Sequence, residues 1–331
     1  MAGLVGIIAN PASGKDIRRL VAHASTFDDN EKANIVRRVL LALEALGVPE
    51  VHYLPESHGI CRRAAQQAGV SLAMIPLPME VIGHPSDSTE AAQRLADMGA
   101  GCIVTLGGDG TNRVVAKGCG DVPLVPISTG TNNVFPTMVE GTLAGLAAAL
   151  AALRPDVAVT TRHPRLLVSI DGEPRDMALV DVVTSSQSWV GARAVWDPAH
   201  LREIVVSRVP DAAIGLSGVA ALLHPDIAGA GTDRGVHVFL GDGGSTLLAP
   251  IAPGVVRTLA VRTSTVIAPG DIVRLQGGAG TIALDGEREI ELLRDDQTRA
   301  LTVELRTDGP SVVDIPATIA AAARAGVFTD R

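Results

Sequence analysis

The first 153 residues alternate short apolar runs with helical patterns, and this alternation constrains the fold more than any other feature of the chain. The runs Leu4–Ala9 and 102–106 are short and almost entirely apolar, as buried parallel strands are. The clearest amphipathic helix covers residues 31–46, with an apolar stripe made by Ile35, Val39, Leu40, Leu43 and Leu46. Strands that alternate with helices predict a parallel, doubly wound α/β sheet.

Beyond about residue 160 the pattern changes to short strands separated by Asp-Gly turns, which predicts a mostly antiparallel β-sandwich. We expect its strands at 166–170, 178–184, 236–240, 258–265, 272–276, 281–284, 290–293 and 301–307. Two helices, at 198–207 and 212–223, are expected as an insertion over the cleft between the domains. The predicted domains are an α/β domain at 1–155, a sandwich at 156–315 with an insertion near 197–231, and a C-terminal helix at 316–331 that packs back on the first domain.

The composition excludes several functional classes. The net charge of −8 argues against a surface for nucleic acids or anionic membranes. Three widely spaced cysteines form neither a disulfide framework nor a metal-ligand pattern. No secretory leader opens the chain, and its longest apolar stretches are shorter than a membrane span. We therefore expect a cytoplasmic protein that has no nucleic-acid or membrane partner. A homo-oligomer is a separate expectation.

The stretch at 102–117 (CIVTLGGDGTNRVVAK) reads as strand, glycine turn and helix, which is a geometry that binds phosphate. Gly107, Gly108 and Gly110 let the backbone approach an anion, and Thr111 adds a hydroxyl. Asp109 is unusual beside a phosphate, since a carboxylate repels it. It fits a residue that holds a metal ion or takes a proton from an attacking hydroxyl. The alternative is a turn in which Asp109 only caps the helix.

Two further polar loops follow apolar strands. The first contains Asn10, Ser13, Gly14 and Lys15 and precedes a helix with Ile17, Leu20 and Val21 on one face. The second, at 128–133, contains Ser128, Thr129, Gly130, Thr131, Asn132 and Asn133. Ligands of such sheets bind beyond the carboxyl ends of the strands, so three polar loops at this edge predict a single site.

Taken together, these segments resemble the superfamily that joins NAD kinases with diacylglycerol and sphingosine kinases. Its hallmark is a strand followed by Gly-Gly-Asp-Gly-Thr, which residues 107–111 match without gaps. The start Asn-Pro-x-Ser-Gly at 10–14 and the Asp-Gly-Glu at 285–287 are similar to the lipid-kinase branch, and 248–253 resembles a segment of NAD kinases. The greatest similarity is to the subgroup of predicted ATP- or polyphosphate-dependent NAD kinases that includes acetoin-catabolism protein X.

The resemblance implies an NAD kinase-like two-domain fold with a nucleotide phosphate in the cleft between the domains. It implies ATP and Mg²⁺ as cofactors and NAD as an acceptor, with Asp109 as the catalytic aspartate and Glu287 as the lipid-kinase general base. The nucleotide would be bound by Asn10, Ser13, Gly14, Lys15, Gly107, Gly108, Gly110, Thr111, Ser128, Thr129, Gly130, Thr131, Asn132 and Asn133.

The chain also departs from these families. The NAD-kinase signature Thr-Pro-Thr-Gly-Ser-Thr-Ala-Tyr is absent, and 243–247 is at best a remnant of it. The string Asp-Gly-Glu also occurs at 171–173, where it reads as a plain hairpin turn, so Glu287 could belong to a similar turn. The leading hypothesis is a kinase that phosphorylates a hydroxyl of a soluble dinucleotide. The alternatives are a nucleotide-binding sensor without catalysis and a lipid kinase.

Overall fold

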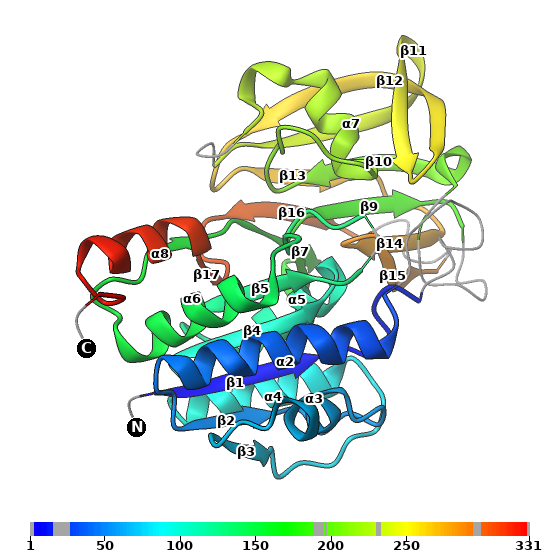
Figure 1. The fold of residues 1–331 in the computed structure, drawn as a ribbon. Helices are drawn as coiled ribbons and strands as arrows, with labels where there is room; N and C mark the ends of the chain where they lie inside the picture. The colour runs from blue at the N-terminus through cyan, green and yellow to red at the C-terminus, as the bar shows by residue number, and fades with distance from the viewer. Residues whose placement is uncertain are drawn as a thin grey trace.

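The structure is a computed structural model and describes residues 3–15, 27–130, 132–187, 195, 197–229, 233–293 and 299–329. Two layers are visible in Figure 1: an α/β layer built mainly from the N-terminal part of the chain and a layer of antiparallel sheets. The helix predicted after Lys15, and Thr131 of the third polar loop, lie outside the described residues.

A seven-stranded sheet with the order β3-β2-β1-β4-β5-β17-β6 forms the centre of the α/β layer. Its first five strands are parallel, as predicted, and pair in register from Leu4↔Glu50 and Val5↔Cys102 onward. β17 pairs parallel to β5, and β6 closes the edge antiparallel to β17. The strands are β1 Leu4–Ala9, β2 Glu50–Tyr53, β3 Ala73–Pro76, β4 Cys102–Gly107, β5 Leu124–Ser128, β6 Thr160–Arg162 and β17 Ser311–Val313.

Helices cover both faces of this sheet, which makes it doubly wound. The core on one face joins β1, β4 and β5 to α2 Asp29–Ala45, α3 Ile60–Ala68, α6 Gly141–Leu153 and the start of α8 Ile315–Arg324. The core on the other face joins the same strands to α4 Ser86–Asp97 and α5 Asp109–Ala116. None of the helices in the described part of the chain is long and apolar enough to cross a membrane.

The direction of winding reverses between β1 and β4. From β1 the chain proceeds outward to β2 and β3, and it then returns to place β4 and β5 on the other side of β1. A crevice opens at the carboxyl ends of the strands where such a reversal occurs. The loops that follow β1 and β4 contain the first two predicted phosphate loops, so the topology brings them together.

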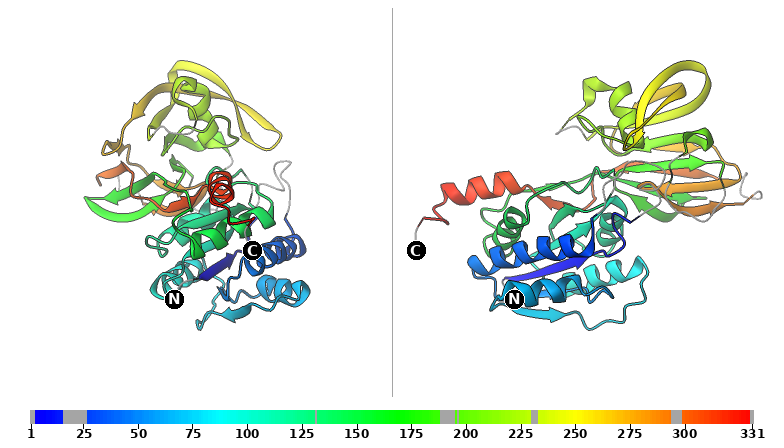
Figure 2. Two further views of the ribbon diagram at one scale, coloured as in Figure 1. Left: turned by 60° about the vertical axis from the view of Figure 1, so that its left-hand side comes forward. Right: turned by 45° about the vertical axis from the view of Figure 1, so that its right-hand side comes forward.

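Two antiparallel sheets form the second layer, as the sequence predicted. Their facing sides share a core of aliphatic residues from β7, β9, β14 and β16. Figure 2 shows the long β11–β12 hairpin at the end of the sandwich farther from the α/β layer. The six-stranded sheet contains β12 Val255–Ile267, β11 Gly235–Ala252, β10 Leu201–Val206, β9 Asp181–Ser185, β14 Gly280–Leu284 and β15 Glu287–Leu292, and the four-stranded sheet contains β13 Ile272–Leu275, β16 Leu301–Arg306, β7 Arg165–Ile170 and β8 Glu173–Ala178.

The predicted helix at 198–207 is wrong. Apart from a single 3-10 turn at Pro198–His200, this segment is strand β10, and β9 and β11 pair with it on either side. Ile204, Val205 and Val206 are buried there, and β-branched residues favour a paired strand. The second predicted helix is present as α7 Leu216–Leu223, which begins later than expected. Two strands within the range assigned to the sandwich, β6 and β17, belong to the first sheet instead.

Candidate active site

The three predicted loops line one pocket at the crevice beside β1 and β4. The amide Nδ2 of Asn10 donates to Oγ1 of Thr111 at 2.8 Å, which joins the first loop to the second. The hydroxyls of Ser13 and Thr129 lie 2.8 Å apart and join the first loop to the third. The predicted residues that line the pocket are Asn10, Ser13, Gly14, Gly108, Asp109, Gly110, Thr111, Gly130, Asn132, Asn133 and Glu287.

Glycine is required where these loops touch. A β-carbon on Gly14 would lie 2.7 Å from the carbonyl oxygen of Thr129, and Gly14 also has a positive φ of 71°. A β-carbon on Gly130 would lie 2.8 Å from Cα of Gly108. No side chain fits at such distances, so the backbones of the three loops form the wall of the pocket directly.

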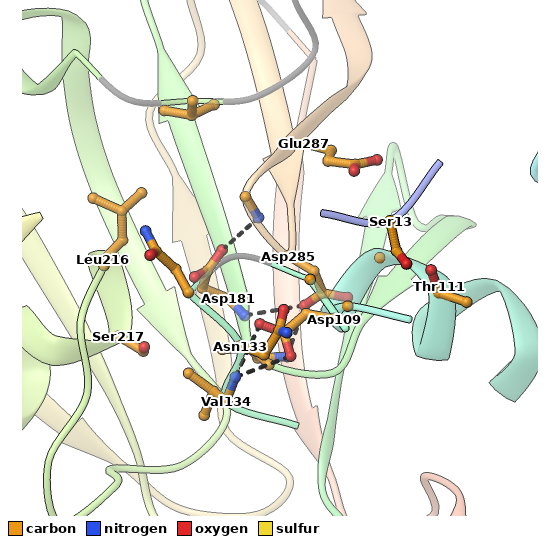
Figure 3. A pocket seen from close by; sticks show the side chains of 18 of the residues that line it. Ser13, Asp109, Thr111, Asn133, Val134, Asp181, Leu216, Ser217, Asp285 and Glu287 are labelled. Carbon is orange, nitrogen blue, oxygen red and sulfur yellow. Dashed lines mark hydrogen bonds between the residues drawn. The ribbon is translucent and has the colours of Figure 1, made fainter. Parts of the chain in front are cut away.

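Asp109 is the first residue of α5 and binds the third loop. Its carboxylate accepts hydrogen bonds from the backbone N–H groups of Val134, at 3.1 Å, and Phe135, at 2.8 Å. The N-cap residue of α5 is Gly108, so a capping role does not account for the aspartate. Asp109 therefore fixes the start of α5 against the segment after β5, with its carboxylate at the wall of the pocket (Figure 3).

The antiparallel layer supplies the opposite wall. Asp181 at the start of β9 and the turn Asp285-Gly286-Glu287 between β14 and β15 line the pocket. The segment Ile214–Ser217 at the start of α7 also lines it. In Figure 3, Leu216 and Ser217 lie on the side opposite Ser13 and Thr111. The pocket is thus enclosed by both layers of the molecule.

Asp285 is completely buried and holds the turn in place. Its Oδ1 accepts hydrogen bonds from the N–H groups of Leu179, Val180 and Asp181 at 3.0, 2.7 and 3.3 Å. The turn is fixed a second time because the N–H of Gly286 donates to Oδ1 of Asp181. Burial raises the pKa of Asp285 to about 6, although Arg113 and the backbone N–H groups favour the ionised form.

Glu287 follows this turn and lies against the Gly-Gly-Asp-Gly-Thr loop. A β-carbon on Gly110 would lie 3.3 Å from the carboxyl carbon of Glu287, so the carboxylate lies in close contact with the backbone of this loop. The fold therefore brings together the two predicted catalytic residues, which are 178 positions apart in the sequence. Both line the same pocket, one from each layer.

The pocket is acidic. Four carboxylate residues line it, namely Asp109, Asp181, Asp285 and Glu287, and no lysine or arginine occurs among the described residues of its lining. No group of three or more His, Cys, Asp or Glu side chains arranged for metal binding is present in the described part of the chain either. An anionic ligand in this pocket therefore requires its charge to be neutralised by backbone N–H groups, by the start of α5 or by a cation that enters with it.

A buried lysine supports the first loop from behind. Nζ of Lys32 on α2 donates to the carbonyl oxygens of Asn10, Pro11 and Ser13 at 3.0, 3.0 and 2.8 Å. Burial lowers its pKa to about 8, and the positive charge of Lys15 acts in the same direction. These bonds occupy the carbonyl side of the loop. Lys32 stands in the apolar stripe of α2 with Ile35 and Val39, a position that could have identified it from the sequence.

Four of the predicted nucleotide-binding residues do not line this pocket. Lys15 pairs with Asp29 on α2, with Nζ and Oδ1 2.8 Å apart. Gly107 ends β4 and packs against Thr111, Ser128 accepts a hydrogen bond from Asn133, and Thr129 is buried beside Ser13. These residues support the loops rather than form the pocket surface. The residues of the wall that were not predicted as site residues are Ala12, Val134, Val180, Asp181, Val195, Ile214, Gly215, Leu216, Ser217, Ile251, Asp285 and Gly286.

Arg208 was also missed by the sequence analysis. Its Nη2 donates to the carbonyl of Val134 at 3.2 Å, on the segment that Asp109 holds. Burial lowers its pKa, whereas the charge of Asp109 opposes that shift. Arg208 follows β10, which was predicted to be helical, so no pattern in the sequence placed it beside the loop at 128–135.

Comparison with known proteins agrees with this architecture. Residues 5–154 match the ATP-NAD kinase N-terminal domain, and residues 164–308 match the acetoin catabolism protein X C-terminal domain. A Bacillus anthracis str. Sterne protein assigned as a diacylglycerol kinase superimposes with a TM-score of 0.51 at 12% identity, over 96% of this chain and 99% of that one. The chain thus has the fold of NAD kinases and diacylglycerol kinases, and the family match supports a kinase-like protein.

Sequence similarity over the whole length defines the family more narrowly. Acetoin catabolism protein X of Cupriavidus necator (strain H16) is 38% identical over 341 aligned positions, which include 98% of this chain and 93% of that protein. The chain belongs to the acetoin catabolism protein X family. The predicted membership in the superfamily of NAD kinases and diacylglycerol kinases is confirmed.

Proposed function

We propose that this protein is a cytoplasmic ATP-dependent kinase that phosphorylates a hydroxyl of a soluble dinucleotide such as NAD. The observation that carries the proposal is the contact between the Gly-Gly-Asp-Gly-Thr loop and Glu287. A glycine loop at a helix start holds phosphate, and a carboxylate beside it can accept a proton. The kinase-like domain of the family supports the same reaction class, and the name of the relative links the function to acetoin catabolism.

The donor set fits a nucleotide that carries Mg²⁺. The described lining has four carboxylate residues and no basic side chain, so a bare triphosphate would be repelled. Mg²⁺ usually retains several waters and binds one or two carboxylates together with phosphate oxygens, so no ready-made cluster of ligands is needed. Asp109 is the carboxylate that would hold it, since Asp285 is buried and paired with Arg113 and Glu287 is the candidate proton acceptor. When bound, the ion neutralises charge on the phosphates.

The residues of the pocket have distinct roles in the proposed transfer. The backbone of the three loops positions the γ-phosphoryl group, and the start of α5 stabilises its charge. The acceptor hydroxyl forms an O–P bond while the bond between the γ-phosphorus and the bridging oxygen of ADP breaks, and the hydroxyl proton passes to Glu287 or Asp109. The oxygens of Asp109 already accept hydrogen bonds from the N–H groups of Val134 and Phe135. Glu287, whose carboxylate lies against Gly110 of the glycine loop, is the preferred proton acceptor.

The direct test offers several substrates to the same preparation. The protein is incubated with Mg²⁺ and ATP labelled in the γ-phosphate, with NAD in one tube and diacylglycerol vesicles in another, and a third tube contains NAD with labelled polyphosphate. We expect label on the dinucleotide from ATP. Label in the lipid extract alone would show that the protein is a lipid kinase. Label on the dinucleotide from polyphosphate alone would show that polyphosphate, and not ATP, is the phosphate donor.

A nucleotide sensor is the second candidate, and the state of Asp109 favours it. Both oxygens of this carboxylate are held by backbone N–H groups, as a purely structural residue would be. A sensor predicts that calorimetry detects binding of ATP, NAD or NADP without any transfer of label. Transfer of label from ATP to NAD would exclude the function of a sensor without catalysis.

A further inference from the structure

Arg113 lies one helical turn after Asp109 on α5 and is 2% exposed. It forms ion pairs with three carboxylates of the antiparallel layer. Its Nη2 lies 2.6 Å from Oε1 of Glu289, its Nη1 lies 3.5 Å from Oδ2 of Asp176, and its Nε lies 3.5 Å from Oδ2 of Asp285. These partners stand on β15, on β8 and in the turn before Glu287. One side chain thus connects α5 to three elements of the other layer.

Two carboxylates next to these ion pairs each bind a backbone segment through N–H groups. On one side, Asp109 of the same helix accepts hydrogen bonds from Val134 and Phe135. On the other side, Asp285 accepts hydrogen bonds from Leu179, Val180 and Asp181. The two clamped segments pack against each other, since Phe135, Met177, Leu179 and Val180 form one small core with Ala116 of α5 and Val134. Helix α5 therefore fixes both walls of the pocket.

The start of α5 is itself fixed to the sheet. Asn112 donates to the carbonyl of Gly108 and accepts from the hydroxyl of Thr105 on β4, at 2.9 and 2.7 Å. Because α5 is anchored to β4 in this way, a movement of the turn at 285–287 would change the distance between that turn and the start of α5. Arg113 spans the distance between them with a planar guanidinium group that has donors in several directions, which a lysine ammonium does not reproduce.

We propose that Arg113 is a positioning residue that sets the Asp285–Glu287 turn over the phosphate loop and so fixes the geometry of phosphoryl transfer. The proposal rests on the proposed kinase function. It explains why a fully buried arginine lies between two segments that each line the pocket. Removal of a bidentate or multiply paired arginine shifts the attached groups, and a displacement of about 1 Å at a reacting group costs roughly 100-fold in rate.

The test compares Arg113→Lys with the control Lys117→Met. Lys117 is the C-cap residue of α5, one turn after Arg113, and pairs with the same Asp176 at 2.6 Å, but its side chain is 31% exposed. For Arg113→Lys we expect a kcat that falls about 10- to 100-fold while the Kd for Mg-ATP changes less than about threefold, because Arg113 lies outside the pocket lining. Hydrogen exchange at the amides of Leu179, Val180 and Asp181 should become faster. The control should change each quantity less than about twofold.

A stability effect is separated from positioning by a second pair of variants. Arg113→Met removes the positive charge that faces Asp285 and Glu289 and should unfold readily. The double variant Arg113→Met, Glu289→Gln removes one of those two carboxylate charges, so it should recover thermal stability and not kcat. Recovery of kcat in the double variant would overturn the proposal. So would an Arg113→Lys variant in which kcat and the hydrogen exchange at 179–181 equal those of the wild type. If the wild-type protein transfers no phosphoryl group, the kinase function fails, while exchange at 179–181 still decides whether Arg113 holds the turn.

Discussion

The chain contains two Asp-Gly-Glu turns with nearly the same backbone and different surroundings. Asp171 and Gly172 have φ values of 55° and 83°, and Asp285 and Gly286 have 52° and 76°. Both turns are two-residue hairpin connections, and each aspartate exchanges hydrogen bonds with a neighbouring segment: Asp171 with Ala300, and Asp285 with residues 179–181. As local structures, the two turns are equivalent.

The difference between the turns lies in what faces them. The side chain of Asp171 is 54% exposed and pairs with Arg299 at the surface. The side chain of Asp285 has no exposed area and faces the buried Arg113 of α5. A motif of three residues thus sets the shape of the turn, whereas the opposite layer determines whether the turn can take part in chemistry.

The largest difference is expected when each aspartate is truncated. Asp285→Ala leaves Arg113 with fewer counter-charges and three backbone N–H groups without their acceptor, and we expect a loss of about 3–5 kcal/mol in the free energy of unfolding. Asp171→Ala removes a surface contact and should cost about 0.5 kcal/mol. Denaturant titration of both variants measures the difference. Equal losses would show that burial of Asp285 contributes nothing beyond the turn itself.

The raised pKa of Asp285 makes its contribution to stability depend on pH. Burial raises the folded pKa to about 6 from the ordinary 3.8, so the folded protein binds the proton more tightly than the unfolded chain. This contribution is fully present below pH 3.8 and decreases by about 3 kcal/mol as the pH rises to 6. The difference in unfolding free energy between wild type and Asp285→Asn isolates this effect, because other groups cancel. A flat difference across this range would contradict the raised pKa.

The glutamates that end the two turns separate catalysis from hairpin structure. Glu287→Gln removes the proposed proton acceptor, and kcat should fall about 100-fold with little change in nucleotide affinity. Glu173→Gln makes the same change in the exposed turn and should leave kcat unchanged. A turnover assay with Mg-ATP and the acceptor identified above measures both. A wild-type kcat in Glu287→Gln would transfer the role of proton acceptor to Asp109.

Features encoded locally could be predicted from the sequence. The strands before Asn10, Gly107 and Ser128 are almost entirely apolar, and the polar or glycine residues that follow them mark loops. Because carboxyl ends of parallel strands share one edge, these loops were expected to meet, as the contacts from Asn10 to Thr111 and from Ser13 to Thr129 show. The resemblance to lipid kinases predicts Glu287 as a site residue, and the structure places it in the wall of the pocket.

Features that depend on tertiary pairing could not be predicted. Residues 201–206 form a strand because β9 and β11 flank them, and their own pattern does not exclude a helix. Arg113 resembled any polar residue of a short helix, since its three partners come from residues 176–289. Asp181 follows an apolar run without a turn residue, so nothing marked it as part of the pocket.

The smallest difference between the two turns is expected for substitution of their glycines, because the cost should be equal in both turns. Gly172 and Gly286 both have positive φ, which an L-residue with a β-carbon adopts at a cost of about 1–2 kcal/mol. Gly172→Ala and Gly286→Ala should therefore lower the free energy of unfolding by the same amount within about 0.5 kcal/mol, in contrast to the aspartate pair. Denaturant titration of the two variants provides the measurement. A much larger loss for Gly286→Ala would mean that the pocket constrains the backbone of that turn as well as its side chains, and the equivalence of the two turns as local structures would then fail.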